Sequence, residues 1–493
     1  MTLIVASLIE GSIQEASASS KEAFAAGADL VELRLDHLKD FDIHMVRKAR
    51  REILGPTIAT LRSKDQGGRS SLSGAKRAEA IKEILSSDFE YVDLELDSDK
   101  ALLRKGRDLA ETGTRVIVSS HLQKPSSRAT LERKLAESLA LGDIAKVAMQ
   151  CEDASQALDL AQVGLKMSRQ RKEYVLIGMG IQGQLTRVFA DRIGSSLVYS
   201  CLAGKPAAPG QLEVATQASL LSESRVVLGL IGHPVSHSVS KPMQEAALKQ
   251  LGLTGVYLPL DIPPKRFDGN ILRIMKTLGF KGINVTIPHK GDAFRLSDSQ
   301  GEAATATRAV NTIKFAGSKL IGENTDVFGF VKLIEGKTTI THSTNVLVIG
   351  AGGAARAVAY VLSERQAILT VIDVEHQRAV ELARAFGGKA VSVRKLWSSD
   401  RSFDLVVNCT PVGMKGVAGS PLKASFVRPG STYIDIIYNP PATRAMELAS
   451  GRGARAYGGL EMLVQQGAES FRIWTGREPN VEAMREAAGR ALQ

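Results

Sequence analysis

Five residues that could do chemistry stand on or directly after apolar, strand-like runs in the first half of the chain. The run VELRLD places Glu32 and Arg34 two residues apart, on one face of a strand, and Arg62 ends TIATLR. His121 follows VIVSS, and Lys146 lies inside DIAKVAMQ. A lysine in an apolar pocket beside other cations favours its neutral form and becomes a nucleophile toward a ketone, and a neighbouring histidine can move a proton. Each residue alone is compatible with a structural role, but their shared position at strand ends indicates a site.

The elements that must position these residues alternate between short apolar strands and helical stretches over roughly the first 220 residues, about the size of one barrel domain. The strands are expected at 3–7, 29–34, 56–61, 90–95, 115–119, 144–149, 174–178 and 196–200. Strands that alternate with helices predict a parallel sheet, and eight such units favour a closed (β/α)₈ TIM barrel. Barrels of this kind carry their chemistry at the C-terminal ends of the strands, which is where the five residues lie.

The motifs ELRLD, SSH at a strand end and the lysine of DIAKVAM resemble the type I 3-dehydroquinate dehydratases over residues 1–218. The resemblance implies that Lys146 forms a Schiff base with the ring ketone of 3-dehydroquinate. It also implies that His121, oriented by Glu32, moves the protons as water is lost to give 3-dehydroshikimate. The substrate-binding residues that it implies are Arg34, Arg62, Arg187 and Gln211. Gln66 stands where this family often has an acidic residue, and Ala207 where it often has a serine; both positions belong to the rim of the substrate site.

The second half contains a glycine turn between a strand and a helix, in VLVIGAGGAARAVAYVL (346–362). Gly350, Gly352 and Ala355 match G-x-G-x-x-A, in which the first glycine allows a tight turn and the second lets the backbone approach a pyrophosphate. The next strand ends at Asp373, where an acidic residue would accept hydrogen bonds from ribose hydroxyls. We therefore predict a Rossmann domain over residues 326–459 that binds a dinucleotide. Its expected cofactor contacts are Gly350, Ala351, Gly352, Gly353, Ala354, Asp373, Arg378, Thr410 and Gly459.

Four segments before this turn carry hydroxyl, amide and charged side chains. They are GHPVSHSVSKP (232–242), GINVTIPHKGDA (282–293), RAVNTI (308–313) and GENTDVFGF (322–330). Serine-rich loops are usually solvated turns, and Lys290 and Asp326 could be surface charges. Beside a dinucleotide fold, however, the segments indicate a hydroxyl-rich substrate with a lysine near its reacting carbonyl.

Residues 225–493 resemble the shikimate dehydrogenases, because HSxS, NVTIPHK, AVNT, NTD, GAGGAAR, NCTPVGM, DIIYNP and GGLEMLVQQGA occur in that family's order. The resemblance implies an α/β substrate domain at 225–325, completed by helices at 460–493, and hydride transfer from a nicotinamide to the ketone of 3-dehydroshikimate. Lys290 and Asp326 would form the catalytic pair, in which Lys290 assists proton delivery to the forming alkoxide and Asp326 holds it. The implied substrate-binding residues are Ser238, Ser240, Asn284, Thr286, Asn311, Tyr438 and Gln466.

The cofactor preference depends on the residues that follow the second Rossmann strand. NADP is the default of the resembled family, and many of its members carry Asn-Arg-Thr at this place. This chain has Asp373, Val374 and Glu375 instead. A carboxylate accepts from a free 2′-hydroxyl and repels a 2′-phosphate, whereas Arg378 could still reach a phosphate. The residues thus favour NAD or the use of both cofactors.

The composition fits small anionic ligands. The 493 residues include 63 Lys and Arg and 52 Asp and Glu, a net charge of +11, but the charges are interspersed. This pattern favours anionic substrates or a phosphate-bearing cofactor over nucleic acid. No apolar run reaches the roughly 18 residues of a membrane helix, and neither the three cysteines nor the eight histidines have metal-ligand spacing. We expect a cytoplasmic enzyme without a metal, as a monomer or a homodimer.

The two resemblances together imply a bifunctional enzyme of aromatic amino-acid biosynthesis, whose first half makes the 3-dehydroshikimate that its second half reduces. Two alternatives remain from the residues alone. The folds could serve as a metabolite-sensing module without turnover, although Lys146, His121, Lys290 and Asp326 are all present. The second half could also prefer quinate to shikimate, since the two compounds differ by one hydroxyl and one double bond.

Overall fold

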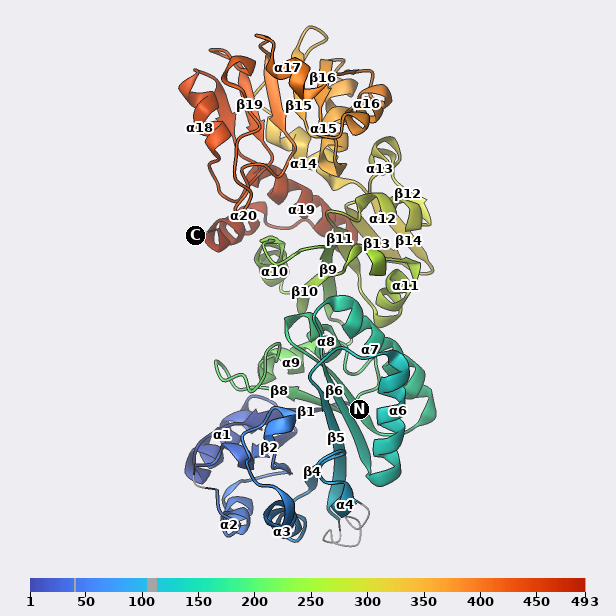
Figure 1. Cartoon of the computed structure of the whole chain (residues 1–493), viewed down its shortest axis with the longest axis vertical. Helices are drawn as coiled ribbons and strands as arrows, with labels where there is room; N and C mark the ends of the chain where they lie inside the picture. The colour runs from blue at the N-terminus through green and yellow to red at the C-terminus, as the bar shows by residue number, and fades with distance from the viewer. Residues whose placement is uncertain (40, 104–112, 493) are drawn as a thin grey trace. The chain divides into compact units, whose positions relative to one another are not determined.

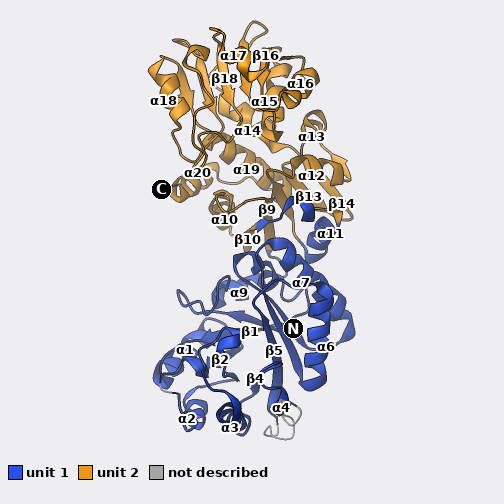
Figure 2. Cartoon of the chain, in the orientation of Figure 1, with its two compact units in different colours: residues 1–225, 260–266, 270–279 blue, residues 226–259, 267–269, 280–493 orange. Residues whose placement is uncertain are grey.

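The computed structural model describes residues 1–39, 41–103 and 113–492 (Figure 1). The chain divides into two compact units (Figure 2). The first contains residues 1–225, 260–266 and 270–279, and the second contains residues 226–259, 267–269 and 280–493. No helix in the described ranges is long and apolar enough to cross a membrane.

The first unit is built on eight parallel strands in the order β7-β6-β5-β4-β3-β2-β1-β8, and all eight predicted strands are present. The strands are β1 (Leu3–Leu8), β2 (Leu30–Arg34), β3 (Thr57–Thr60), β4 (Tyr91–Glu95), β5 (Arg115–Leu122), β6 (Ile144–Gln150), β7 (Tyr174–Met179) and β8 (Leu197–Ser200). The predicted eight-stranded barrel is confirmed; it is nearly closed, because β7 and β8 share no ladder among these described strands. Two hydrogen bonds bridge the gap, from Ser196 N to Tyr174 O (2.8 Å) and from Leu176 N to Ser195 Oγ (3.1 Å).

Alternate residues of these strands point into the barrel, because side chains of a strand alternate between its two faces. An inner apolar layer includes Val5, Leu30, Ile58, Ile117 and Ile144. Two residues further along the same strands come the polar residues Ser7, Glu32, Thr60, Ser119 and Lys146. The chain therefore places an apolar floor beneath a polar layer at the C-terminal ends of the strands.

Helices cover the outside of this barrel and bury the outward-facing strand residues, such as Val31, Leu33 and Ala59. They are α1 (Ile13–Ala25), α2 (Met45–Glu52), α3 (Gly74–Leu85), α4 (Lys100–Leu103), α6 (Arg128–Leu141), α7 (Ala154–Met167), α8 (Leu185–Val188) and α9 (Val214–Leu220). Ser12 and Asp153 accept hydrogen bonds from first-turn N–H groups and so begin α1 and α7.

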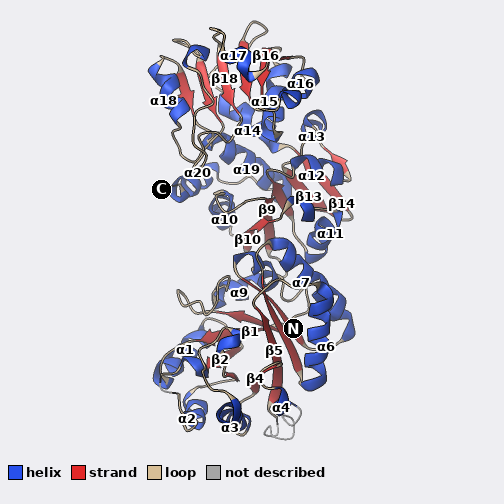
Figure 3. Ribbon diagram, viewed as in Figure 1, coloured by secondary structure: helices blue, strands red, loops and turns tan. Residues whose placement is uncertain are grey.

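The second unit contains two sheets of six strands each (Figure 3). The first sheet is mixed, in the order β10-β9-β11-β13-β14-β12. Its strands are β9 (Val226–Gly232), β10 (Gly255–Asp261), β11 (Gly282–Val285), β12 (Ser299–Gln300), β13 (Thr312–Ala316) and β14 (Lys319–Glu323). The helices of this region that belong to the second unit are α10 (Ser240–Gln250), α12 (Lys290–Leu296) and α13 (Glu302–Thr307), whereas α11 (Gly269–Leu278) lies almost entirely among residues of the first unit.

The second sheet is parallel throughout, in the order β17-β16-β15-β18-β19-β20. This order reverses between β15 and β18, as it does at the ligand crevice of a Rossmann sheet. The strands are β15 (Asn345–Ile349), β16 (Ile368–Ile372), β17 (Lys389–Ala390), β18 (Leu405–Asn408), β19 (Thr432–Asp435) and β20 (Arg455–Tyr457). The helices are α14 (Thr325–Ile334), α15 (Gly353–Glu364), α16 (His376–Ala385), α17 (Val393–Trp397) and α18 (Arg444–Gly451).

The last two helices, α19 (Leu460–Thr475) and α20 (Val481–Ala491), return to the first of these sheets. Phe471 and Trp474 of α19 and Met484 of α20 share a core with Leu228 and Met243. The Trp474 indole donates to Ile313 O (3.0 Å), which fixes α19 against β13.

Candidate active sites

Lys146 projects from β6 into the polar layer of the barrel and is almost completely buried. Its Nζ lies 3.1 Å from Asp93 Oδ2 and 3.7 Å from Glu32 Oε1. The ring of Tyr199 lies 3.8 Å from the same Nζ. Two carboxylates and one aromatic face therefore define the position of the lysine nitrogen, which agrees with a side chain held for chemistry rather than one that extends to solvent.

Asp93 connects this lysine to its neighbours and was not among the predicted site residues. Its carboxylate also accepts hydrogen bonds from Arg62 (2.9 Å) and Ser119 Oγ (2.6 Å). Burial acts to raise the pKa of Asp93, but Arg62 and Lys146 outweigh it and hold the pKa below its ordinary value. The sequence signal was the pattern YVDLE, in which two acids occupy the inward face of β4.

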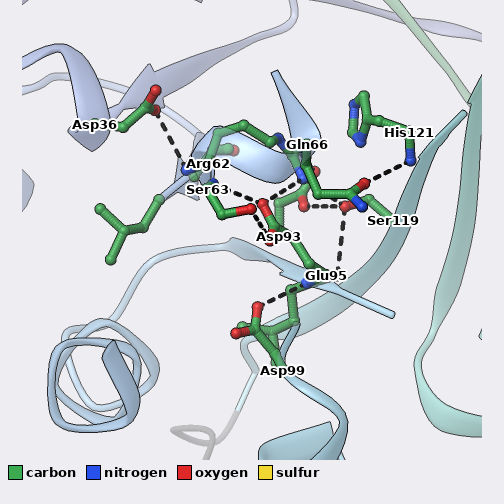
Figure 4. A network of polar contacts seen from close by, with 12 residues as sticks. Asp36, Arg62, Ser63, Gln66, Asp93, Glu95, Asp99, Ser119 and His121 are labelled. Carbon is green, nitrogen blue, oxygen red and sulfur yellow. Dashed lines mark hydrogen bonds and ion pairs between the residues drawn. The ribbon is translucent and has the colours of Figure 1, made fainter. Parts of the chain in front are cut away.

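Arg62 anchors the loop that follows β3 (Figure 4). Besides Asp93, its guanidinium donates to Ser119 Oγ (2.8 Å) and to Glu95 Oε1 (3.4 Å). The carboxylate of Glu95 also accepts hydrogen bonds from the main-chain N (2.8 Å) and the Oγ (2.6 Å) of Ser63. Burial alone would lower the pKa of Arg62, but Asp93 and Glu95 raise it above its ordinary value, so the guanidinium stays charged.

His121 lies on β5, on the same face as Ser119, and its main-chain N donates to Gln66 Oε1 (2.7 Å; Figure 4). The imidazole Nδ1 is buried and has no hydrogen-bond partner among the residues that the structure describes. Burial, Arg62 and Lys146 together hold the pKa of His121 well below its ordinary value. The imidazole is therefore neutral and able to accept a proton.

Glu32 was expected to orient His121, but the structure places it elsewhere. Its carboxylate accepts from Ser7 Oγ (2.9 Å) and Thr60 Oγ1 (3.0 Å), and it approaches Lys146 instead. Among the described residues, no hydrogen bond joins Glu32 to His121. Ser7 of β1 and Thr60 of β3, the strands on either side of β2, hold the carboxylate in this position.

Two arginines predicted to bind the substrate differ in their surroundings. Arg34 forms a two-pronged ion pair with Asp36 (2.9 and 2.8 Å), whose carboxylate also accepts from Arg62 N (3.3 Å). Arg187 is buried and donates to Gly178 O (2.6 Å), but its Nε has no hydrogen-bond partner and no carboxylate in the described ranges pairs with it. Burial lowers the pKa of Arg187 to about 10. An anionic ligand would satisfy this cation.

Gln211, also predicted to bind the substrate, is bonded within its own loop. Its Oε1 accepts from Ala207 N (2.7 Å) and Ala208 N (3.2 Å), and its Nε2 lies 3.5 Å from Ser7 Oγ. The glutamine therefore shapes the 207–211 loop and reaches the hydroxyl that Glu32 holds.

The second site lies in the other unit, where Lys290 begins α12 and Asp326 lies in the first turn of α14. Lys290 Nζ is 2.5 Å from Asp326 Oδ2, and the other carboxylate oxygen accepts from Asn311 Nδ2 (2.9 Å). Asn311 Nδ2 also lies 3.3 Å from Gln466 Oε1. Four predicted residues are thus brought together by direct contacts.

Asn284 joins this group through residues that the sequence did not reveal. Its Nδ2 donates to Ser470 Oγ (3.0 Å), and Ser470 also lies 3.0 Å from Thr325 Oγ1. The Oδ1 of Asn284 accepts a hydrogen bond from Tyr257 OH (2.9 Å). Ser470 lies four residues after Gln466 on one face of α19, and that spacing was the available signal.

Ser238, Ser240 and Tyr438 form a second group of predicted residues. Ser238 Oγ lies 3.0 Å from Ser240 Oγ. Burial raises the pKa of Tyr438 and of Tyr257, and the neighbouring Ser238 and Ser240 act in the opposite direction on the two tyrosines, respectively. Thr286 uses its main-chain N to bond Ile231 O (2.8 Å), and its side chain is half-buried.

The glycine turn after β15 fits a dinucleotide. Gly350 has φ +101°, and a Cβ there would lie 2.9 Å from Thr410 Cγ2. A Cβ on Gly353 would lie 3.0 Å from Lys290 Cδ, so the turn adjoins the second site. Helix α15 begins at Gly353, and its N-cap, Gly352, provides no side-chain cap. Its uncapped N–H groups suit a pyrophosphate.

The predicted ribose pocket contains Asp373 and Arg378. Asp373 accepts from Ala351 N (2.7 Å) and Glu375 N (2.9 Å), so each carboxylate oxygen already holds one main-chain N–H. Arg378 pairs loosely with Glu375 (3.5 Å), and its NH2 lies 3.9 Å from the Cβ position of Gly352. The last predicted cofactor residue, Gly459, precedes α19 and donates to Ile437 O (2.9 Å). No cluster of His, Cys, Asp or Glu in the described part of the chain could hold a metal ion.

Family models match both halves of the chain. Residues 4–228 match type I 3-dehydroquinase, and residues 230–313 match the shikimate dehydrogenase substrate binding domain. Residues 332–426 match the shikimate / quinate 5-dehydrogenase model, and residues 459–488 match the shikimate 5′-dehydrogenase C-terminal domain.

Individual proteins agree with these matches. The chloroplastic bifunctional 3-dehydroquinate dehydratase/shikimate dehydrogenase of Arabidopsis thaliana is 31% identical over 501 residues, which cover 96% of this chain and 82% of that protein. A shikimate dehydrogenase (NADP(+)) of Methanopyrus kandleri is 42% identical over 273 residues, covering 53% of this chain and 94% of that one. A crystal structure of the Thermus thermophilus shikimate 5-dehydrogenase with NADP(H) and shikimate aligns with TM-score 0.50 and 37% identity, over 54% of this chain and 100% of that chain.

Proposed function

Since this chain belongs to the family of bifunctional 3-dehydroquinate dehydratases/shikimate dehydrogenases, we propose which of its residues carry each of the two reactions. The first unit is a lyase of the type I class, and the second is an oxidoreductase. We assign residues 1–218 to the dehydratase, 225–325 with 460–493 to the substrate domain, and 326–459 to the Rossmann domain. The buried contact of Lys146 with Asp93, one strand away from a neutral His121, is the observation that carries the first assignment.

In the dehydratase, Lys146 Nζ attacks the ring ketone of 3-dehydroquinate, and loss of water gives a Schiff base. The neutral His121 then removes a proton from the carbon next to the iminium and returns it to the departing hydroxyl, which leaves as water. Hydrolysis of the Schiff base releases 3-dehydroshikimate and restores the lysine. Arg62 and Asp93 keep the lysine in place while the substrate is bound.

The substrate carboxylate is assigned to the arginines. Arg187 is supported most directly, because its buried guanidinium has no carboxylate partner among the described residues. Arg34 is held in one orientation by Asp36, and Arg62 by Asp93, so both present fixed donors. Gln211 is the last of the proposed substrate-binding residues, and it holds the 207–211 loop near Ser7.

In the reductase, Lys290 Nζ gives a proton to the ketone oxygen of 3-dehydroshikimate, and Asp326 holds that Nζ in place. A bound nicotinamide cofactor supplies the hydride. Ser238, Ser240, Asn284, Thr286, Asn311, Tyr438 and Gln466 bind the hydroxyls and the carboxylate of the substrate. Their support is the set of hydrogen bonds that joins Asn284 and Gln466 to Asn311, and Asn311 to Asp326, together with the contact of Ser238 with Ser240.

The cofactor is held by the turn at Gly350–Ala354 and by Thr410 and Gly459. The relatives named above include an NADP(+) enzyme and a structure with NADP(H). For this chain we infer use of both NAD and NADP. Asp373 disfavours a 2′-phosphate, but two N–H groups offset part of its charge, and Arg378 over the glycine turn favours a phosphate.

One reaction vessel tests the whole proposal. The protein is mixed with 3-dehydroquinate and either NADPH or NADH, and the enone absorbance and the reduced cofactor are followed together. We expect the enone to appear first and the reduced cofactor then to fall. An enone that accumulates without oxidation of either cofactor would overturn the assignment of the second site, and the absence of both the enone and cofactor oxidation would overturn the first.

The ligands are small molecules, and we expect a cytoplasmic protein that is a monomer or a homodimer. Its free thiols, Cys151, Cys201 and Cys409, support a reducing compartment. Light scattering of the purified chain measures the number of subunits.

A further inference from the structure

The parallel sheet of the second unit ends in a buried carboxylate that no cation pairs with among the described residues. Asp435 is the last residue of β19 and has no exposed surface. Its register partner, Asn408, is the last residue of β18, and Asn408 in turn is paired with Ile349, directly before the glycine turn. The three residues therefore lie side by side at the carboxyl edge of the sheet, where ligands of Rossmann domains bind.

Four donors converge on Asp435. Oδ1 accepts from Asn408 Nδ2 (3.0 Å) and Ile437 N (3.2 Å), and Oδ2 accepts from Tyr433 OH (3.1 Å) and Thr443 Oγ1 (2.8 Å). A carboxylate can accept all four hydrogen bonds. An asparagine offers one acceptor oxygen, and its own N–H groups would face some of these donors. The arrangement therefore requires an acid, although burial raises the pKa of Asp435.

Asp435 sets the orientation of Asn408. Because the Nδ2 of Asn408 is bound to Asp435, its Oδ1 points the other way and accepts from Thr410 N (3.0 Å) and Thr410 Oγ1 (2.7 Å). Thr410 in turn lies against the glycine turn, since its Cγ2 is 2.9 Å from the Cβ position of Gly350. A hydrogen-bonded path thus runs from the buried acid to the surface where the dinucleotide is proposed to lie.

Resting on that proposed cofactor site, we propose that Asp435 is a positioning residue for dinucleotide binding, which acts by fixing Asn408 and, through it, the Thr410 loop against Gly350. The contacts of Lys290, Asp326, Asn311 and Asn284 involve other residues. The substrate contacts should therefore be insensitive to the acid at 435.

The test compares Asp435→Asn with Asp404→Asn. Asp404 lies at the opposite edge of the same sheet, where it accepts from Asn345 N (2.9 Å) and pairs with Arg428. Dissociation constants for NADPH and NADH are measured from the fluorescence of the bound reduced nicotinamide, without turnover. We expect Asp435→Asn to raise both constants by about tenfold, the loss of one anchoring hydrogen bond. The KM for shikimate and the dehydratase rate of the same chain should not change, and Asp404→Asn should bind as the wild type does.

A second variant keeps the inference testable if Asp435→Asn does not fold. Asn408→Ser retains the acid but breaks the path to Thr410, and it should weaken cofactor binding in the same selective way. A folded variant of either kind with wild-type affinity would overturn the inference, as would an equal rise in the KM for shikimate. If neither variant keeps the second unit folded, the role of Asp435 is structural and the inference is wrong. Absence of dinucleotide binding by the wild type would overturn the proposed function itself.

Discussion

Asp93 Oδ2 and Lys146 Nζ lie 3.1 Å apart at the buried centre of the barrel. The same oxygen accepts from Arg62 (2.9 Å). One carboxylate therefore holds both the proposed nucleophile and a proposed substrate-binding arginine, and any change at Asp93 acts on both. This coupling explains why an acid with no assigned contact to substrate stands at the centre of the site.

Replacing Asp93 by Asn should reduce both stability and dehydration. Two buried cations would lose their shared counter-charge, and breaking such a pair costs about 3–5 kcal/mol of unfolding free energy. Urea denaturation and the dehydratase rate measure the two effects. Asp97→Asn is the matched control, because exposed Asp97 pairs with Lys134 at the surface (3.0 Å) and should contribute little. Equal stability of the two variants would contradict the proposed role of Asp93.

Lys146→Ala should abolish dehydration and leave the reduction of 3-dehydroshikimate unchanged, since the two sites belong to different units. Borohydride reduction in the presence of 3-dehydroquinate should add to the wild type only the mass of substrate or product less one oxygen atom, because imine formation loses water and reduction adds two hydrogens. Lys166→Ala, at an exposed lysine paired with Glu132, is the control. Dehydration at the wild-type rate by Lys146→Ala would disprove the Schiff-base assignment.

The dehydratase should keep its activity at pH values below 6.5, which is the ordinary pKa of a histidine side chain. Burial, Arg62 and Lys146 depress the pKa of His121, so its neutral form persists as the pH falls through 6.5. The free energy of unfolding should change with pH in the same range. As the pH falls, His121 binds a proton in the unfolded chain before it does in the folded chain, so its contribution to stability is constant above about pH 6.5 and decreases below it. The pH profile of kcat/KM for dehydration measures the acid limb, and a limb centred at about 6.5 would contradict this prediction.

Lys290→Met should lower kcat for reduction by about 10²- to 10⁴-fold, the usual contribution of a positioned proton donor. Cofactor affinity and dehydration should remain as in the wild type, because Lys290 Nζ pairs with Asp326 and the side chain approaches Gly353 through its apolar carbons, which Met also provides. Steady-state kinetics with 3-dehydroshikimate measure the loss. A variant that reduces 3-dehydroshikimate at the wild-type rate would move the proton donor elsewhere.

Arg378→Gln should lower kcat/KM for NADPH by about tenfold, equivalent to about 1.4 kcal/mol, and leave NADH unaffected. Asp373→Asn should act in the opposite direction and favour NADPH, because it removes a negative charge that faces the 2′-position. The ratio of the two specificity constants is the measurement. A ratio that neither substitution changes would contradict the proposed use of both cofactors.

The strands could be predicted because apolar alternation and strand length are local properties. All eight barrel strands lie where the sequence indicated, and the face of each inward residue follows from the period of two. The approach of Glu32 to Lys146 was not foreseen, because the alternation fixes the face of a residue but not its neighbours across the barrel. The orientation of His121 by Glu32 stays a prediction. The predicted eight-stranded barrel is confirmed, with β7 and β8 joined by two hydrogen bonds near the start of β8 instead of a ladder.

The contacts that complete the sites could not be predicted because they join distant segments. Asp93 reads as one of two acids on a strand until Lys146 and Arg62 are seen to share it. Ser470 looks like any polar helix residue until its hydroxyl is found beside Asn284. Such pairings depend on how strands and helices are arranged in space, and this arrangement cannot be inferred from residue patterns in a single sequence.

Because α19 lies near the end of the chain and returns to the first sheet of its unit, the two sites are completed at different stages of synthesis. Every site residue proposed for the dehydratase lies within the first 211 positions, and β1 is already paired with β8 there. Gln466 and Ser470 are made near the end of the chain and contact Asn311 and Asn284, respectively. On the ribosome, the first active site can therefore be complete while the second still lacks a wall. A chain that ended before Gln466 would therefore keep every proposed dehydratase residue and lack Gln466 and Ser470 of the second site. We expect such a chain to make 3-dehydroshikimate without reducing it.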